Sequence, residues 1–488
     1  MMETETELTD DIDQPLRDRL KAHPKPALLW GIGLCVLLLL EGPTYLDGLL
    51  GAIGYGLAVV PGAPGAEAFA SAAAFFGELP HLLSRELIPN RGYYDGSSWQ
   101  GTFLGLEPKY AWLIRFLLVY VYVAVLLGWL WYGYVLFRRH YRAANWTPTD
   151  DVIDRLRSHY WGLFGLAVVV FFITMAAFAP VVGPTTAEEN IEGPYSHEMQ
   201  YFNEDTETVE TITIGEANLG SASRGSGDSN VGLWSYDDFG RFHPVGTLVS
   251  GKDLFTFLAF GARVSLFIGL GSMAIAGFIA TTLALVTAYY KGVTDLIVVL
   301  TSDSVQAMPA LLLVILATVV FKNHWIAEIY NGAMLFILLF ALIRWPGLWR
   351  AVRGPALQVG EQEWVDAAKS YGQRPTVIMR KHMAPYILGY LLVYASLTLG
   401  GVIISVSALS FLGLGITAPT PEWGRAINIG QQYIASQSWH ISLIPGILIT
   451  LVVTGFNALS DGIRDAIDPQ SEGAEGGATG AAAGGGGG

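Results

Sequence analysis

The sequence predicts an all-α polytopic membrane protein with about eight transmembrane helices. Hydrophobic residues fill 52% of its 488 positions, and charged residues fill only 14%. Several apolar runs reach the roughly 20 residues that a helix needs to cross a bilayer. In chain order, these runs predict spans at 27–40, 110–137, 161–182, 257–290, 296–321, 334–349, 386–405 and 441–456.

Basic residues set the expected orientation of these spans. Arg138, Arg139 and Arg142 directly follow the second run, and further lysines and arginines occur at 350–381. Cytoplasmic loops carry an excess of Lys and Arg, so both segments are expected inside. With eight spans, both termini are then cytoplasmic, and the acidic loop at 185–242 lies outside. Within that loop, an alternating pattern from Glu207 to Ile214 predicts a β-strand.

The ends of the chain and its first part differ from the remainder. Residues 1–26 lack the basic start of a signal peptide and predict a cytoplasmic tail. Residues 27–150 contain two spans and an external segment, in which 66–83 predicts a re-entrant or interfacial helix. Residues 471–488 are rich in Gly and Ala and predict a disordered tail.

Composition and motifs exclude several classes of protein. The net charge of −14 argues against nucleic-acid binding, which needs basic patches, and suits a host that lives at high salt. Gly251-Lys252 completes the spacing of a phosphate-binding loop, but Asp253 replaces the Ser or Thr that would bind magnesium, and no strand precedes the loop. Cys35 is the single cysteine, so no internal disulfide can form. No catalytic or metal-binding constellation is evident, so we expect a protein that is not an enzyme and binds no cofactor.

A polar island at 361–385 lies between the sixth and seventh apolar runs. Glu363 and Asp366 are three residues apart and would share one face of a short helix. Gly372 suits the positive φ that ends a helix, and Pro375 suits the first turn of the next helix. The island therefore predicts a helix, a turn and a second helix.

Small and basic residues complete this island. Ala367 and Ala368 would let another surface approach the helix backbone closely. Arg380, Lys381 and His382 fall near the expected C-terminal end of the second helix, where positive charge is favoured. On spacing alone, an ordinary amphipathic surface helix with a glycine cap explains the island equally well.

Further motifs occur in order along the second half of the chain. They read HPVGT (243–247), GKD (251–253), GARVS (261–265), RWPGLWR (344–350), SALSFLGLGITAPTPEWG (407–424) and a closing stretch that ends in DGIRDAIDP (439–469). Any one of them could be structural, with glycines for close packing and prolines for turns.

Together with the island, these motifs resemble the permease subunits of ATP-binding-cassette (ABC) importers for dipeptides, oligopeptides and nickel, and 407–424 is similar to their C-type subunit. The resemblance covers roughly 155–470, a six-span permease domain, which leaves 27–150 as an extra region. Three positions depart from the usual pattern: Lys252 replaces Arg, Asp366 replaces Glu, and Met383-Ala384 replaces Ile-Leu.

The resemblance implies a permease in the plasma membrane that translocates peptides. Its partners would be two ABC ATPase subunits that hold ATP and magnesium, a homologous second permease, an extracytoplasmic substrate-binding lipoprotein and membrane lipid. The loop at 355–385 would be the EAA loop that docks into an ATPase subunit. The residues that it implies for this coupling are Glu363, Asp366, Ala367, Ala368, Gly372, Arg374 and Pro385.

The loop at 407–438 would face the docked binding protein. The residues that the resemblance implies there are Ser410, Phe411, Gly413, Gly415, Pro421, Glu422, Trp423 and Gly424.

Asp303 is an acid inside the fifth apolar run, and Pro309 follows it. Such an acid faces protein or a water path, so it would line the translocation path, contact another subunit or form an interhelical hydrogen bond. The alternative function is an ion-coupled secondary transporter with Asp303 as its proton site. A membrane sensor or scaffold is a third hypothesis, and it leaves the polar island unexplained.

Overall fold

The computed structural model describes residues 16–46, 50, 54, 65–77, 79, 81–142, 147–223 and 231–467. Residues 1–15 and the expected disordered tail at 471–488 lie outside the described residues. Within them, six helices are long and apolar enough to cross a membrane, or up to eight if each of two bent helix pairs is one span. The predicted fold class, an all-α polytopic membrane protein, is confirmed.

The centre of the molecule is helix α11 (Leu254–Tyr290), which packs against α15 (Ala333–Gly360), α8 (Tyr160–Ala177) and α18 (Ala384–Phe411). Ala276, Ala280, Ala284 and Ala288 recur every fourth residue on α11 and are buried to within 1%. Small residues at this spacing form one flat stripe, which allows neighbouring helix backbones to approach closely. Helix α20 (His440–Ile467) closes the bundle against α8 and α18.

Two predicted spans differ from the observed helices. The fifth run is broken into α12 (Gly292–Ala307) and α13 (Ala310–Val320), which are bent by 81° at Met308-Pro309 because proline lacks the N–H that would continue the helix. The sixth run, predicted at 334–349, is longer than expected, since α15 continues without a break through Pro346-Gly347 to Gly360.

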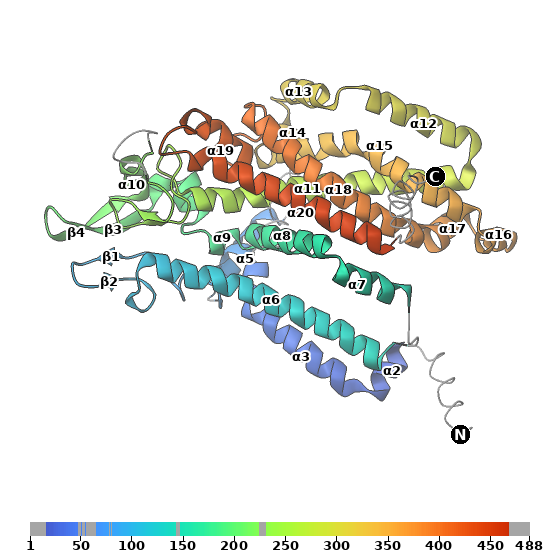
Figure 1. Ribbon diagram of the computed structural model, residues 1–488, viewed down its shortest axis with the longest axis horizontal. Helices are drawn as coiled ribbons and strands as arrows, with labels where there is room; N and C mark the ends of the chain where they lie inside the picture. Colours follow the sequence, from blue (N-terminus) through green and yellow to red (C-terminus); the bar gives the residue numbers. More distant parts are fainter. Residues whose placement is uncertain are drawn as a thin grey trace, which may run out of the picture.

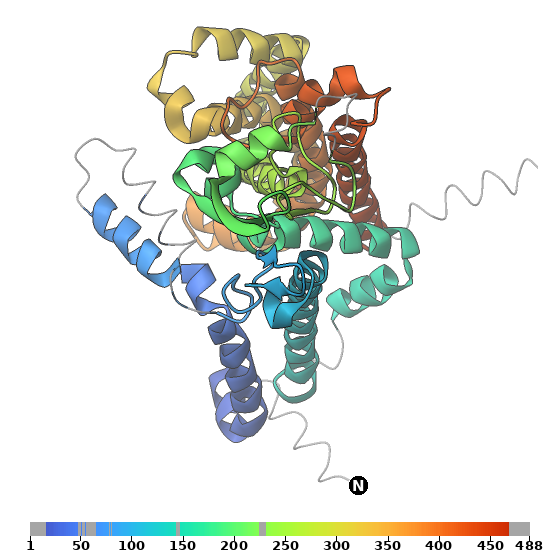
Figure 2. The same ribbon diagram turned by 90° about the vertical axis from the view of Figure 1, so that its left-hand side faces the viewer.

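The extra N-terminal region contributes two of the predicted spans. Helix α3 (Pro24–Leu40) follows the short α2 (Leu16–Ala22) at a 96° bend and packs on α6 (Pro108–His140). Helix α6 contacts the bundle through α8 and α9 (Ala179–Val182), so α3 lies on the outside of the molecule (Figure 1 and Figure 2). The apolar stretch at 66–83 contains α5 (Ala66–Gly77).

Two arginines, the fully buried Arg115 and the partly buried Arg85, join this extra region to the bundle. The guanidinium of Arg115 donates to the carbonyls of Ile88, Val181 and Gly183 at 2.9–3.1 Å. Arg85 donates to four carbonyls between Pro180 and Thr185 at 2.6–2.9 Å. Because a buried cation is tolerated only when its donors are satisfied, these bonds fix the two regions together.

Short strands lie at one end of the molecule. The strand predicted at 207–214 is confirmed as β4 (Thr208–Thr213), which forms an antiparallel hairpin with β3 (Glu198–Asn203). The hairpins β1 (Tyr93–Tyr94) with β2 (Trp99–Gln100) and β5 (Ser235–Tyr236) with β6 (Phe242–His243) also form. In Figure 1, β1–β4 lie at one end of the long axis, opposite α16 (Glu363–Ser370), α17 (Pro375–Ile378) and α2.

The remaining helices are short. They are α7 (Pro148–Ser158), α10 (Ile214–Gly220), α14 (Trp325–Glu328) and α19 (Trp423–Gly430).

Candidate functional site: the coupling loop and the outer loop

The polar island folds as the sequence predicts, into a short helix, a turn and a second helix. Helix α16 buries Val365 and Ala368, which are 0% and 5% exposed. Trp364 and Tyr371 beside them are 43% and 86% exposed. The helix is thus held to the bundle by one narrow face, and its other faces are open.

Gly372 ends α16 in the expected conformation, with φ of +70°. The N–H of Gly372 bonds to the carbonyl of Lys369 at 2.9 Å, and the N–H of Gln373 bonds to the carbonyl of Ala368 at 3.2 Å. These bonds satisfy carbonyls that the helix end would leave unpaired. Pro375 is the first residue of α17, as predicted.

The basic cluster was placed at a helix end, and this prediction is wrong. Arg380, Lys381 and His382 lie in a π-helical turn (Met379–Met383), and the chain continues without a break into α18. Pro385 has no N–H for a regular i−4 bond, and a wider turn before it accommodates the missing donor. The second helix of the loop is therefore the start of a membrane-spanning helix.

Contacts from two long helices support α16. Lys291, directly after α11, forms an ion pair with Glu361 at 3.2 Å, and Lys369 lies over the ring of Tyr289. On the other side, the rings of Trp364 and Tyr386 stack at 5.7 Å, and Tyr386 belongs to α18. Helix α16 therefore contacts α11 through Lys369 and α18 through Trp364. The sequence analysis missed these supporting residues because their partners are distant along the chain.

Of the seven predicted coupling residues, one is buried and six are exposed. One of them, Ala368, is buried against the chain's own core, so the expectation that it leaves room for another surface is wrong. Asp366 pairs with Lys369 at 2.9 Å on the exposed side. The exposed members are Glu363, Asp366, Ala367, Gly372, Arg374 and Pro385.

Asp303 forms an ion pair with Arg350, which joins α12 to α15. A second pair of the same kind joins Asp295 to Arg353, with Nε and Oδ1 at 2.8 Å. The interhelical bond considered for Asp303 is therefore present, although its side chain is 54% exposed. Asp295 was missed, although an acid at the start of an apolar run is a visible signal. Pro309 lies at the break and precedes α13.

The loop at 407–438 is folded inward over much of its length. Trp423 is fully buried, and its Nε1 donates to the carbonyl of Leu258 at 2.7 Å. Gly261 makes room for this indole, since a Cβ there would lie 2.7 Å from it. Glu422 is also fully buried, accepts from the hydroxyl of Ser407 at 2.9 Å and caps α19.

The prediction that eight residues of this loop face outward is wrong for several of them. The buried ones are Ser410, Pro421, Glu422, Trp423 and Gly424. The reason is close packing, since a Cβ on Gly424 would lie 1.8 Å from the carbonyl oxygen of Ser407. Gly413 is exposed, and Phe411 and Gly415 are partly buried.

The HPVGT and GKD motifs form a buried ionic network at the N-terminal end of α11. His243 contacts Asp253 through Nδ1 at 2.8 Å and Asp237 through Nε2 at 3.4 Å. Asp253 accepts from the N–H of Thr256 at 2.6 Å and so caps α11. Lys252 donates to the carbonyl of Ile191 at 3.0 Å. Its ammonium group is therefore bound to the chain's own backbone, where a phosphate-binding loop would direct it to a phosphate.

Charge in this network is mutually reinforcing. Burial opposes ionisation of Asp237, yet Arg241 and His243 outweigh it and hold the pKa of that carboxyl below its usual range. Burial likewise opposes the charged form of His243, but Asp237 and Asp253 raise its pKa. The two carboxyl groups therefore favour the charged form of His243.

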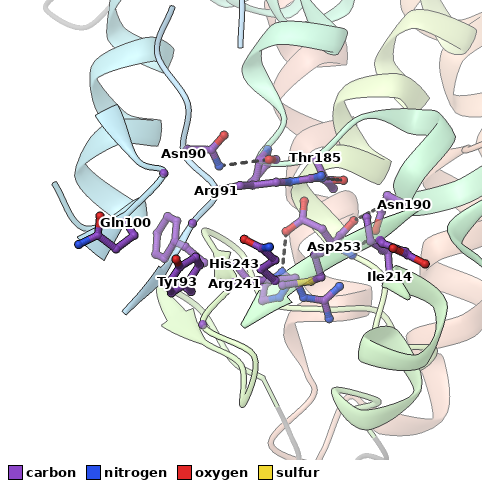
Figure 3. Close-up of a pocket in the computed structure, with 18 residues that line it drawn as sticks. Asn90, Arg91, Tyr93, Gln100, Thr185, Asn190, Ile214, Arg241, His243 and Asp253 are labelled. Carbon is purple, nitrogen blue, oxygen red and sulfur yellow. Dashed lines mark hydrogen bonds and ion pairs between the residues drawn. The ribbon is translucent and has the colours of Figure 1, made fainter. Parts of the chain in front are cut away.

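A cavity of about 280 Å³ lies beside this network, between the extra region and the segment 184–253. Figure 3 shows Asn90 and Arg91 of the extra region reaching toward Thr185, with Asp253 and Asn190 on the other wall. Arg91 forms an ion pair with Glu189 at 2.7 Å. This wall belongs to the interface that attaches the extra region.

The fold and these two loops define a polytopic membrane protein with an exposed short helix at one end and a folded loop at the other. Residues 258–472 match the family described as binding-protein-dependent transport system inner membrane component. Residues 147–205 match the N-terminal transmembrane domain of oligopeptide transport permease C.

Similar proteins carry consistent names. The chain is 31% identical over 324 residues to the dipeptide transport system permease protein DppC of Alkalihalophilus pseudofirmus, which covers 66% of this chain and 90% of that protein. It is 29% identical over 324 residues to the oligopeptide transport system permease protein OppC of Bacillus subtilis. This alignment covers 66% of this chain and 89% of that protein. It is 29% identical over 327 residues to the glutathione transport system permease protein GsiD of Escherichia coli. This alignment covers 67% of this chain and 92% of that protein.

The chain therefore belongs to the family of binding-protein-dependent permeases of ABC importers, in the group that contains dipeptide, oligopeptide and glutathione permeases. It is a multi-pass membrane component. An ion-coupled carrier with Asp303 as its proton site does not fit this family, and Asp303 is paired with Arg350.

Proposed function

We propose that this chain is one half of the translocation pathway of a peptide importer in the cell membrane. A homologous second permease completes the pathway, and an extracytoplasmic binding protein delivers the substrate. Two ATPase subunits bind ATP and magnesium, and this chain binds no cofactor itself. Both termini are cytoplasmic, at the end where α16 lies.

One observation carries the proposal: α16 is an exposed helix on a fixed base. Its buried face holds it between the ends of α11 and α18, and Asp366 and Ala367 are open to a partner. A partner that grips α16 and moves would turn both long helices, because packed helices move as rigid bodies. A surface helix without a partner would need no such support from two spans.

The peptide substrate is supported by the printed names of the relatives, which transport dipeptides, oligopeptides or glutathione. Uptake of a labelled dipeptide by cells that co-express the full importer tests this part. Competition by unlabelled dipeptides is the expected result. Uptake of nickel alone, without competition by dipeptides, would contradict it.

Co-purification with ATPase subunits tests the docking part. The variant Asp366→Lys/Ala367→Arg changes the charge of the exposed face of α16 without disturbing Val365 or Ala368. Its control, Glu204→Lys/Val209→Arg, makes the same charge change on the exposed outer hairpin. The wild type and the control are expected to retain an ATPase subunit, and the α16 variant to lose it. Equal retention by all three would sink the proposal.

A further inference from the structure

A cavity of about 460 Å³ lies between α3 and α6 at the end of the molecule where α2 and α16 are found (Figure 1). It is separate from both loops described above, and it belongs to the extra N-terminal region. Its rim carries the cationic or hydrogen-bonding side chains of Lys25, Arg139 and His140. Its walls are apolar and aromatic.

The floor of the cavity is built by two tryptophans that interlock. Trp30 donates from Nε1 to the carbonyl of Trp129 at 3.0 Å, and Trp129 donates to the carbonyl of Trp30 at 3.1 Å. Each indole lies over a glycine of the opposite helix. A Cβ on Gly33 would lie 2.2 Å from Trp129, and one on Gly133 would lie 2.3 Å from Trp30. These contacts fix the two helices at a short separation and hold the site open in one shape.

The rim side chains have no anionic partner among the residues that the structure describes. Among the described residues, Lys25, Arg139 and His140 form no ion pair, although the protein carries a net charge of −14. The neighbouring arginines behave differently: Arg138 and Arg142 both pair with Asp150, at 3.2 Å and 2.5 Å. The rim cations are therefore available to an external anion.

The surroundings restrict which anion can bind. The outer faces of the helix pair are apolar, with Leu28, Leu29 and Ile32 between 53% and 67% exposed. A ligand that fills the cavity contacts cations at its polar end and Leu29, Trp129 and Leu136 along its length. An amphiphile with an anionic head and an acyl chain satisfies both requirements. Basic pockets between membrane helices bind anionic lipid headgroups for this reason.

We infer that the α3–α6 cavity is a binding site for a lipid with a phosphodiester headgroup. Arg139 presents a planar fork of N–H donors that matches two phosphate oxygens. Lys25 adds a second positive charge from α3, and His140 adds a ring N–H donor. The interlocked Trp30 and Trp129 pack against the upper part of the acyl chain.

The site gives the extra region a role. Arg85 and Arg115 attach that region to the bundle at one end, whereas the lipid would hold α3 to α6 at the opposite end. The bound lipid thus serves as a structural cofactor for a helix pair in which α6, and not α3, makes the main contacts with the bundle helices α8 and α9.

Lipid binding can be measured on the purified full chain in detergent by native mass spectrometry. The probes are a phosphatidylglycerol, a phosphatidylcholine with the same chains, and inorganic phosphate. The variant Lys25→Gln/Arg139→Gln removes two rim charges. The control Arg374→Gln/Arg380→Gln removes two exposed charges from the coupling loop at the same end of the molecule.

The wild type is expected to bind one phosphatidylglycerol in preference to phosphatidylcholine. Each rim cation contributes roughly fivefold in affinity, so the double variant should bind at least tenfold more weakly, and the control within twofold of wild type. Inorganic phosphate at millimolar concentration should not displace the lipid. Equal binding by wild type and variant would overturn the inference.

Two other occupants are distinguished by the same measurement. If inorganic phosphate competes fully and binds with the same dependence on Lys25 and Arg139, the ligand is a free phosphate and the lipid assignment fails. Residues 1–15 carry six carboxylates at positions 3, 5, 7, 10, 11 and 13. If lipid binds only after residues 1–15 are deleted, that segment fills the cavity, and the inference is again overturned.

Discussion

The indole Nε1 of Trp423 donates a hydrogen bond to the carbonyl of Leu258 across 165 residues of sequence, at 2.7 Å. This bond fixes the outer loop to the first turns of α11. The same helix ends next to Lys291, which pairs with Glu361 beside the coupling helix. At about 1.5 Å per residue, α11 separates the two contacts by roughly 50 Å. One rigid helix therefore joins the outer loop to the coupling loop.

Replacing Trp423 with Ala should lower the free energy of unfolding by about 3–5 kcal/mol, because the indole is fully buried and leaves a cavity. Thermal unfolding in detergent measures this loss. The control is Trp325→Ala, whose indole is 59% exposed and whose loss should be below about 0.5 kcal/mol. Similar losses for both variants would show that Trp423 does not anchor the loop.

Replacing Gly372 with Ala should weaken the coupling loop by about 1–2 kcal/mol. The φ of +70° disfavours any residue with a Cβ, although a Cβ there meets nothing within 4 Å. The cost is thus backbone strain alone, and it should appear as lower retention of the ATPase subunit. Gly354→Ala, in the interior of α15 and also free of contacts, should be neutral or slightly stabilising. Unchanged retention in Gly372→Ala would show that the turn does not position α16.

The buried network of His243, Asp237 and Asp253 predicts a loss of stability at alkaline pH. Since Asp237 and Asp253 raise the pKa of His243, its charged form stabilises the fold fully below its unfolded pKa of about 6.5, and the effect is lost as pH rises through the higher folded value. The pKa of Asp237 is lowered, so its contribution is present above about pH 3.9 and is lost only as pH falls through its folded value.

The variant His243→Gln should no longer lose stability at alkaline pH. The loss expected in the wild type is about 1.5–3 kcal/mol of unfolding free energy, the contribution of a hydrogen bond to a charged group. Unfolding temperatures between pH 6 and 9 report it. His197→Gln is the control, because His197 is partly exposed and pairs only weakly, at 3.7 Å, with Glu188. An alkaline loss that persists in His243→Gln would contradict the assignment.

The ion pair between Asp303 and Arg350 predicts that Asp303 supports transport through its charge and not by transferring a proton. The single variants Asp303→Arg and Arg350→Asp should each lower uptake by placing like charges side by side. The exchange variant with both changes should restore it, and the coupling energy should be modest, about 1 kcal/mol, because both side chains are about half exposed. A proton carrier would stay inactive in the exchange variant.

Features that neighbouring residues encode could be predicted from the sequence, whereas features built by distant contacts could not. The coupling loop was predictable because Gly372 and Pro375 define a turn through their own backbone preferences. The N-terminal end of α11 was missed by three residues, since Asp253 is a helix cap whose role depends on His243 and Asn190.

Long-range packing was not predictable. Nothing in the stretch at 407–424 indicates that Trp423 is buried, because its partners Leu258 and Gly261 lie on another helix. The same limit applies to Ala368, whose small side chain suits an external partner and an internal one equally. The break at Pro309 and the unbroken helix at Pro346 show that proline alone does not decide where a span ends.

Site-specific crosslinking tests the central claim, that α16 is the surface that binds the ATPase. Cys35 is the single cysteine, so Cys35→Ala provides a background into which Ala367→Cys is introduced on the open face of α16. Glu204→Cys on the outer hairpin is the matched exposed control. With the ATPase subunit co-expressed and a bifunctional maleimide added, Ala367→Cys should give a covalent product with that subunit and Glu204→Cys should give none. No product from Ala367→Cys, or equal products from both positions, would contradict the account.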